Sequence, residues 1–544
     1  MTRPARRLPA ASSMIVAPQP EAVEAGADML GAGGNALDAA LAAAFCQGVV
    51  DPLMSGIGGL GSLQVYDPKS GEHLVLDGLS TCPAASRPDM WADLFERECA
   101  DGYGYVLKGG VNELGHSAVT TPGILSVFGL AHARFGRKPW AQLFDAAVGI
   151  ADEGWAVRPH VYTMFALDEA WLGRLPYRAK LAFTPDGARL YLRPDGTPKR
   201  VGDQVRNPEL AETLRGIARD GAESFYTGAI ARRIVADMQA KSGPLTLDDL
   251  KNFKPRVDEP LKVAYRGRIF ALPPPPAGGI VVAEMLRILE HFDLVALGHN
   301  SAEYIRVVAE AMKIAGRDKE RHIGDPDFQP APLDRLLSDA YVAECAAGIR
   351  RGEKADFARA TSDSKGTTTV SCVDAGGMVV SLTHTLGTPS GVIVPGTGFM
   401  LNGAMNWYDP RPGHAGSIAP NKRRFSSLTP TIVFEGGKPV ATLAAPGGAW
   451  IGVAILQVLL NVFDWGMTMQ EAVAAPRFSA TTNTIDIGNR IPRRVQRDLE
   501  AMGYTVKRWP TTFPFAAPHG ITMFDGVLEG GADPQRDGCV QGVA

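Results

Sequence analysis

The 544-residue chain has few of the features that mark metalloproteins and nucleic-acid-binding proteins. Its six cysteines form no C-x-x-C pair, and none lies at zinc-ligand spacing with a histidine, so we expect buried structural thiols and neither a metal nor another cofactor. The 55 basic and 58 acidic residues give a net charge of -3, which does not indicate binding to nucleic acid or to an anionic membrane.

Membrane-directed segments are also not evident in the sequence. Three arginines within residues 1–11 are not followed by the apolar run of a secretory signal. The apolar stretch Ala36 to Val50 contains Asp38 and Gln47 and is too short to cross a bilayer. With 45% hydrophobic and 21% charged residues, the composition is that of a globular protein with a large core. We therefore predict a soluble, cytoplasmic protein.

The hydrophobic patterning predicts mainly helices up to about residue 363 and a strand-rich remainder. Asn35 is the expected N-cap of an Ala-rich helix, residues 273–279 form a proline-rich entry to a helix, and residues 356–366 indicate an exposed linker. Helices are expected at 21–30, 36–50, 125–133, 140–154, 208–219, 302–316 and 450–463, and strands at 63–66, 73–76, 367–374, 378–384, 431–434 and 440–444.

The glycine-rich segment Gly56 to Gly61 has the G-x-G-x-x-G spacing of dinucleotide-binding loops. That motif works only between a strand and a helix, because the helix N-terminus must face the pyrophosphate. A strand-like segment, residues 63–66, follows it here. We therefore interpret these glycines as positions that permit positive φ and close backbone packing.

The junction between Gly366 and Thr367 offers a distinctive chemistry, because a threonine begins a strand directly after the linker. If the bond before Thr367 were cut, its free α-amine would have a pKa of roughly 8, so that it could act as a general base near neutral pH. The neighbouring hydroxyl could then be a nucleophile without a histidine or aspartate partner. A histidine, His384, precedes Thr385 in the sequence. It would be redundant as a general base beside the α-amine, and strand alternation turns its side chain to the opposite face from that of Thr385, so we interpret it as structural.

Two further segments could complete a catalytic site around such a nucleophile. Gly447 and Gly448 lie between a strand and an apolar helix, where their N–H groups could form an oxyanion hole. Ser426 and Ser427 supply paired hydroxyls after a basic run, just before another strand.

These residues resemble the γ-glutamyltranspeptidase family of N-terminal nucleophile hydrolases. The matches extend along nearly the whole chain and occur in the family's order. They lie at residues 33–40, 55–61, 121–123, 225–228, 273–279, 309–313, 324–327, 367–374, 420–427, 445–448 and 533–538.

The resemblance implies an α+β fold, the four-layer αββα sandwich, made as a precursor that cleaves itself between Gly366 and Thr367. Residues 1–366 would form a large N-terminal subunit, and residues 367–544 a smaller one that carries the nucleophile. By residue-to-residue matching, Thr367 is the catalytic nucleophile, Thr385 hydrogen-bonds and tunes it, and Gly447 and Gly448 form the oxyanion hole. The same matching makes Ser426 and Ser427 substrate-binding residues.

The sequence departs from the usual family pattern at the amino-acid end of the pocket. Leu79 replaces the arginine that grips the substrate α-carboxylate, Trp407 replaces the aspartate that pairs with the α-ammonium, and Gly387 replaces an asparagine. This combination resembles the cephalosporin-acylase-like branch, whose members remove acyl groups such as glutaryl from an amine. We therefore expect an amidohydrolase or acyltransferase that acts on a small γ-glutamyl-like or glutaryl-like amide, with water or an amine as acceptor.

Two alternatives remain open from the sequence. A true γ-glutamyltransferase could grip its substrate through other cations, for which Arg87, Lys422, Arg423 and Arg424 are candidates. Alternatively, the chain could be an unprocessed, non-catalytic homologue. The expected partners are the small-molecule substrate and the two subunits of the chain itself, with further oligomerisation left open.

Overall fold

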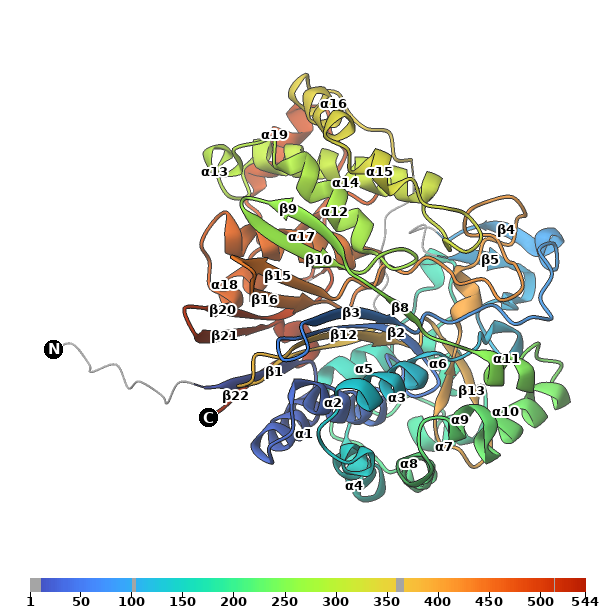
Figure 1. Cartoon of the computed structure of the whole chain (residues 1–544). Helices are drawn as coiled ribbons and strands as arrows, with labels where there is room; N and C mark the ends of the chain where they lie inside the picture. Colours follow the sequence, from blue (N-terminus) through green and yellow to red (C-terminus); the bar gives the residue numbers. More distant parts are fainter. Residues whose placement is uncertain (1–10, 100–103, 359–365, 513) are drawn as a thin grey trace.

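Two antiparallel sheets pack face to face at the centre of the protein (Figure 1). The computed structural model describes residues 11–99, 104–358, 366–512 and 514–544. The Ser371 hydroxyl donates across the interface to the His519 carbonyl (3.0 Å), and the Ser381 hydroxyl donates to the Leu443 carbonyl (3.3 Å). The first sheet has the order β22 (Cys539–Val543), β1 (Ser13–Ala17), β11 (Thr368–Val373), β12 (Val379–Thr385), β2 (Leu60–Asp67), β3 (Glu72–Asp77) and β8 (Arg256–Asp258). The second has the order β21 (Val527–Ala532), β20 (His519–Phe524), β16 (Lys438–Ala444), β15 (Thr431–Glu435), β10 (Arg268–Leu272) and β9 (Leu261–Tyr265).

Helices cover the outer face of each sheet, below the first sheet and above the second in the view of Figure 1. The lower group contains α1 (Pro20–Gly31), α2 (Ala36–Val50), α3 (Ile124–Phe135), α4 (Asp145–Glu153), α5 (Pro159–Phe165) and α8 (Pro208–Asp220). The upper group contains α12 (Gly279–Leu289), α14 (Ala302–His322), α16 (Asp339–Arg350) and α17 (Ile451–Phe463). The remaining helices of four residues or more are α6 (Tyr177–Leu181), α7 (Pro185–Tyr191), α9 (Ser224–Thr227), α10 (Ala229–Ala240), α11 (Leu247–Asn252), α13 (Leu294–Leu297), α15 (Leu333–Leu336), α18 (Met469–Ala474) and α19 (Arg493–Ala501).

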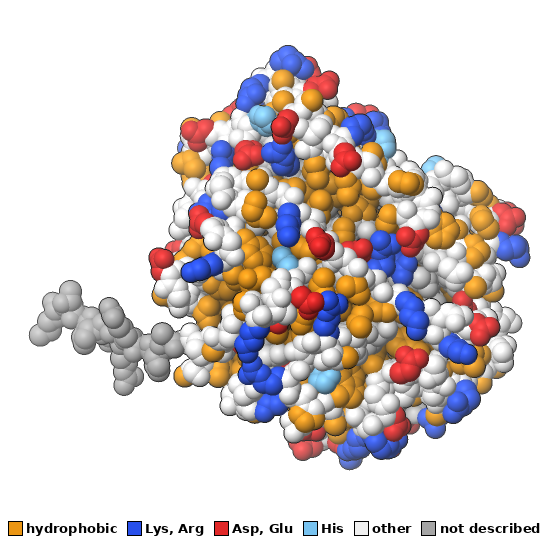
Figure 2. Space-filling view, viewed as in Figure 1, with side chains coloured by type: hydrophobic (Ala, Val, Ile, Leu, Met, Phe, Trp, Pro, Cys, Tyr) orange, Lys and Arg blue, Asp and Glu red, His pale blue; other side chains and the backbone are white. Residues whose placement is uncertain are grey.

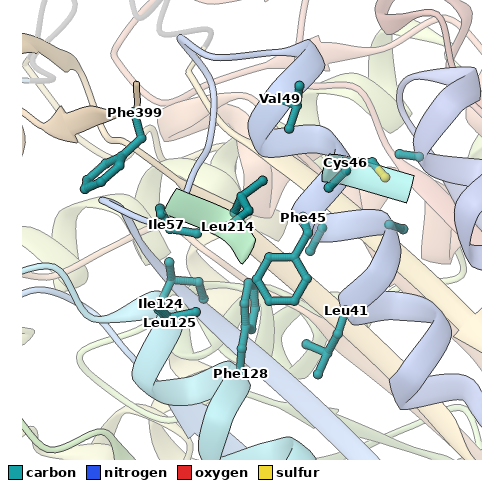
Figure 3. Packing of buried hydrophobic residues seen from close by; sticks show 14 of the residues in the cluster. Leu41, Phe45, Cys46, Val49, Ile57, Ile124, Leu125, Phe128, Leu214 and Phe399 are labelled. Atoms are coloured by element: carbon teal, nitrogen blue, oxygen red, sulfur yellow. The ribbon is translucent and has the colours of Figure 1, made fainter. Parts of the chain in front are cut away.

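The lower core is organised by α2, whose many alanines let the helix lie close to β11 and β12. Asn35 and Asp38 form a reciprocal capping box at its first turn, so the predicted N-cap is confirmed. Phe45 meets Phe128 edge-on with ring centroids 5.5 Å apart (Figure 3). It also stacks on Phe144 with ring centroids 4.0 Å apart. Such aromatic pairs add packing energy beyond the area that they bury.

Most of the predicted elements are confirmed, including the helices that became α1, α2, α3, α8 and α17 and every predicted strand. The predicted helix 140–154 is divided into a 3-10 turn, Trp140–Phe144, and α4. The predicted helix 302–316 extends to His322 as α14. The hairpin β9–β10 lies in a region that we expected to be mostly helical, because its short strands carry only a weak period-two signal.

The prediction of an exposed linker at 356–366 is confirmed at Asp356 and Ala358, which are exposed, and is wrong at Phe357 and Gly366. Phe357 is buried, since its ring packs against Gly316, and Gly366 is buried against Gly387. Residues 359–365 lie outside the described part of the chain. Gly366 and Thr367, on the two sides of the junction, are both buried.

The surface and the cysteines agree with the charge and composition arguments. Basic and acidic side chains are interspersed over the face shown in Figure 2. Cys46, Cys82, Cys99 and Cys372 are buried, and none of the six cysteines forms a disulfide. Within the described ranges, no helix is both long and apolar enough to cross a membrane, and no three metal-ligating side chains converge on a common point.

Candidate active site

Thr367 occupies a strained, buried position immediately before β11. Its side chain is 3% exposed, and its φ of 128° lies in a region that residues with a side chain rarely adopt. A Cβ atom on the preceding Gly366 would lie 2.6 Å from the Gly387 carbonyl oxygen, so only glycine fits there. Strain of this kind costs about 1–3 kcal/mol and occurs preferentially at functional sites.

Thr385 ends β12, the strand that pairs with β11. Thr368 and His384 are the last paired residues of β11 and β12, and Thr367 and Thr385 are the next residues at that open end of the hairpin. The Thr385 hydroxyl accepts a hydrogen bond from the Gly387 amide (2.8 Å). The structure therefore brings the two predicted threonines together.

The glycine-rich segment after α2 supports this strand end. A Cβ on Gly59 would lie 2.3 Å from the Thr385 carbonyl oxygen, and a Cβ on Gly61 would lie 2.8 Å from that of Thr383. Gly56 has a φ of 155°. The prediction that these glycines serve close backbone packing is confirmed, and the packing that they permit is directly beside Thr385.

The two predicted oxyanion-hole glycines lie where β16 leads into α17. Gly447 and Gly448 have φ values of 143° and 55°, and Gly448 begins the 3-10 turn Gly448–Trp450 that precedes the helix. A Cβ on Gly447 would lie 2.3 Å from the Cβ of Ala516. Gly447 thus requires glycine and the φ of Gly448 favours it, and both residues lie just before the N-terminal, electropositive end of a 13-residue helix.

Ser426 and Ser427 are engaged differently, although they are adjacent. The Ser427 hydroxyl donates to the Gly448 carbonyl at 2.6 Å and therefore helps to hold the glycine turn. The Ser426 amide donates to the Pro276 carbonyl (2.8 Å), while its buried hydroxyl has no hydrogen-bond partner among the described residues. An unsatisfied buried hydroxyl costs free energy, which makes Ser426 the better positioned of the two for a ligand.

Leu79 and Trp407 form part of one buried apolar cluster that also contains Trp450 and Ala516. The Trp407 ring lies over Gly387, where a Cβ would be 3.0 Å from the indole. Gly387 in turn contacts Gly366. Trp407 is thus apolar and lies next to the junction, and the absence of a side chain at Gly387 makes room for it. Leu79 is also apolar and buried.

Arg536 contacts the nucleophile position, a role that sequence reasoning missed. Its buried guanidinium donates to the Thr367 carbonyl at 2.7 Å. Burial lowers the pKa of Arg536 to about 10, and burial raises the pKa of the nearby Asp51 carboxyl to about 7 although Arg536 opposes that rise. The sequence signal was its place in the matching segment 533–538.

A second buried ion pair supports the glycine turn from behind. Arg477 and Asp533 form a salt bridge of 2.5 Å, and Arg477 also donates to the Ala516 carbonyl at 3.1 Å. Ala516 is the residue that packs on Gly447. The segment from Asp533 to Arg536 is thus linked to Thr367 directly and to Gly447 through Arg477 and Ala516.

His384 has the structural role predicted for it. Its Nε2 lies 2.8 Å from the side-chain oxygen of Gln47 on α2, and its ring packs near Phe128 of the lower core. Burial lowers the pKa of His384 to about 3, so the ring is neutral at ordinary pH. Glu310 and Lys313, one turn apart on α14, form a buried ion pair at 3.0 Å.

The four cations proposed as alternative substrate grips have other contacts. Arg87 is exposed and pairs with Asp89, whereas the Lys422 ammonium donates to the Ser417 carbonyl. Arg423 donates to the Lys254 carbonyl, and Arg424 donates to the carbonyl of Phe425.

Comparison with known proteins agrees with this geometry. The model of a family described as gamma-glutamyltranspeptidase matches residues 22–543. An acylase ACY 1 proenzyme from Pseudomonas sp. (strain V22) is 36% identical over 534 residues, covering 96% of this chain and 92% of that protein. A glutathione hydrolase proenzyme from Bacillus subtilis (strain 168) is 33% identical over 558 residues, covering 97% of this chain and 91% of that protein. The crystal structure of cephalosporin acylase from Bacillus halodurans has the same mixed helix and strand fold, with a TM-score of 0.86 at 28% identity over 99% of this chain and 98% of that one. The chain therefore belongs to the γ-glutamyltranspeptidase family, whose members include acylases and glutathione hydrolases made as proenzymes.

Proposed function

We propose that this chain is a precursor that cleaves its own Gly366–Thr367 bond and then acts as a Thr-dependent amidohydrolase or acyltransferase on a small acyl amide. The mature protein would consist of residues 1–366 and 367–544, which together build the four-layer αββα sandwich of the N-terminal nucleophile hydrolases. No metal or other cofactor is required. The observation that carries the proposal is the strained, buried Thr367 immediately before β11, at the same end of the hairpin as Thr385.

The first reaction is internal. The Thr367 hydroxyl oxygen attacks the Gly366 carbonyl carbon, the C–N bond breaks, and the nitrogen takes up a proton, which leaves an ester between the two residues. Water then hydrolyses this ester to a Gly366 carboxylate and a free Thr367 α-amine. The left-handed backbone at Thr367 favours the step, because cleavage releases the strain that the φ of 128° stores.

The second reaction uses the same hydroxyl on a substrate amide. The new α-amine, with an unperturbed pKa of roughly 8, takes the hydroxyl proton and later delivers it to the leaving amine. The amides of Gly447 and Gly448 stabilise the tetrahedral oxyanion, and Thr385 orients the nucleophile. Water or an amine then attacks the acyl-enzyme and releases the acyl group.

The acyl group that fits best is glutaryl-like. Trp407 presents buried apolar surface next to the junction, and Leu79 is likewise buried and apolar, so neither offers a counter-charge to an α-ammonium group. The unsatisfied Ser426 hydroxyl is available to a terminal carboxylate. The contacts made by the four alternative cations weigh against a γ-glutamyl grip through them.

Processing is tested by a denaturing gel of the purified protein. Wild-type protein should give two bands, and Thr367→Ala should give one. Thr368→Ala is the matched control, because this adjacent buried hydroxyl has no hydrogen-bond partner among the described residues and should not be needed for cleavage. A single wild-type band together with full amidase activity would overturn the proposal, and a single band without turnover would favour a non-catalytic homologue.

Substrate class is tested with two 4-nitroanilides that differ only in the α-ammonium group, glutaryl and γ-glutamyl. Burying an uncompensated charge at the apolar end should lower kcat/KM for the γ-glutamyl substrate by about tenfold or more. A strong preference for the γ-glutamyl anilide would instead favour a true γ-glutamyltransferase.

A further inference from the structure

An exposed tryptophan and a second tryptophan share contacts with one lysine. Trp171, in the 3-10 turn Ala170–Leu172, is 56% exposed. The ammonium of Lys507, in β19 (Val506–Arg508), lies 5.7 Å from the centre of the Trp171 ring and 4.3 Å from that of Trp509. A cation held between two indoles is a cation–π arrangement.

Aromatic contacts join this group to the oxyanion-hole glycines. Trp509 meets Trp450 edge-on at 5.5 Å, and Trp450 meets Phe515 at 5.1 Å. Trp450 ends the turn that begins at Gly448, and the residue after Phe515 packs on Gly447. The Trp509 indole is fixed in place, since its nitrogen donates to the buried Asp486 carboxylate at 3.0 Å.

Trp171 belongs to the 1–366 part of the chain, whereas Lys507 and Trp509 belong to the 367–544 part, so the group spans both proposed subunits.

We propose that Trp171, Lys507 and Trp509 form the subsite for the amine half of the substrate, and that this subsite selects aromatic amines that carry a carboxylate. The acyl half is accounted for by Leu79, Trp407 and Ser426, so the amine needs a separate surface beside the same glycines. The exposed Trp171 face offers stacking, and Lys507 offers the charge that attracts a carboxylate. The inference rests on the proposed amidohydrolase function.

Two substrates with the same acyl group test the subsite: glutaryl-4-nitroanilide and glutaryl-3-carboxy-4-nitroanilide. Lys507→Met should lower kcat/KM for the carboxylated anilide about tenfold, mainly through KM, and leave the neutral anilide within about twofold. Trp171→Ala should raise KM for both anilides by about two- to tenfold, because the ring stacks on either one. Lys438→Met is the matched control, since this exposed lysine begins β16 at the end of the strand remote from Gly447, and it should change neither substrate.

The outcomes separate the subsite from the underlying function. If the wild-type protein turns over both anilides and Lys507→Met leaves the ratio of their kcat/KM values unchanged, the subsite alone is overturned. An equal loss on both anilides would assign Lys507 a structural role and would also overturn it. Absence of wild-type turnover on either anilide would overturn the proposed function together with the subsite.

Discussion

Replacing Arg536 with methionine should destabilise the protein far more at alkaline than at acidic pH. The reason is the Asp51 carboxyl, which faces Arg536, Gln19, His160 and Asp537. Burial raises the pKa of Asp51 to about 7, against about 3.9 in an unfolded chain. Because the folded-state pKa is the higher one, the stability that Asp51 contributes is present below about pH 4 and is lost as the pH rises through about 7.

The magnitude follows from this difference. The difference between the unfolded-state pKa of about 3.9 and the folded-state pKa of about 7 lowers the free energy of unfolding by about 4 kcal/mol at pH values above both. Removing the Arg536 cation raises the pKa of Asp51 further and leaves a buried carboxylate without its partner, which typically costs about 3–5 kcal/mol. At pH 5.5 the carboxyl is neutral with or without Arg536, so the cost there reduces to the lost hydrogen bond with Thr367, about 1–3 kcal/mol.

The assay is the thermal midpoint of Arg536→Met in a Thr367→Ala background, so that both proteins remain uncut, at pH 5.5 and pH 8.5. Arg87→Met is the control, because its pair with Asp89 is exposed and such pairs contribute about 0–1 kcal/mol. We expect a clearly larger fall in the midpoint at pH 8.5. Equal falls at the two pH values would refute the argument that Asp51 is the buried charge that Arg536 compensates.

Three further predictions concern the glycine turn, the paired serines and the core. Gly447→Ala should lower kcat by at least about 10²-fold, measured on an acyl anilide, because the new Cβ would collide with Ala516 and displace the oxyanion donors; a near-normal kcat would contradict this assignment. Ser426→Ala should mainly raise KM, whereas Ser427→Ala should mainly lower kcat, because Ser427 holds Gly448 and Ser426 is available to the substrate; identical kinetic effects would contradict the division. Phe45→Ala should cost about 3–5 kcal/mol of stability, read as a lower unfolding midpoint, and a change within error would show that the ring cluster of Figure 3 adds little.

Local patterns were sufficient to predict much of this fold. The helices α1 and α2 carry capping and turn residues at their ends, and the β11–β12 hairpin combines β-branched strands with a glycine turn, so each could be located from neighbouring residues. The hairpin β9–β10 was missed, because its stability comes from pairing with β15, more than 160 residues away in the chain. Non-local pairing leaves little trace in a short strand's own sequence.

In the candidate site, too, some residues could be identified from local sequence and others depend on contacts with distant parts of the chain. Thr367 and the Gly447–Gly448 turn could be proposed from their local chemistry, whereas Thr385 was identified only through the resemblance to the family. Arg536 gave no comparable local signal, since its importance comes from burial and from a carbonyl that lies 169 residues away in sequence. The different engagement of Ser426 and Ser427 was equally hidden, because it depends on the position of the Gly448 carbonyl.

The most direct test of the account is the mass of the peptide that begins at Thr367, measured after the wild-type protein is mixed with glutaryl-4-nitroanilide and quenched in acid during turnover. The account predicts that this peptide has a free amino terminus and carries one glutaryl group as an ester on Thr367. An acyl group on any other residue, or full activity from chains in which the Gly366–Thr367 bond is intact, would contradict it.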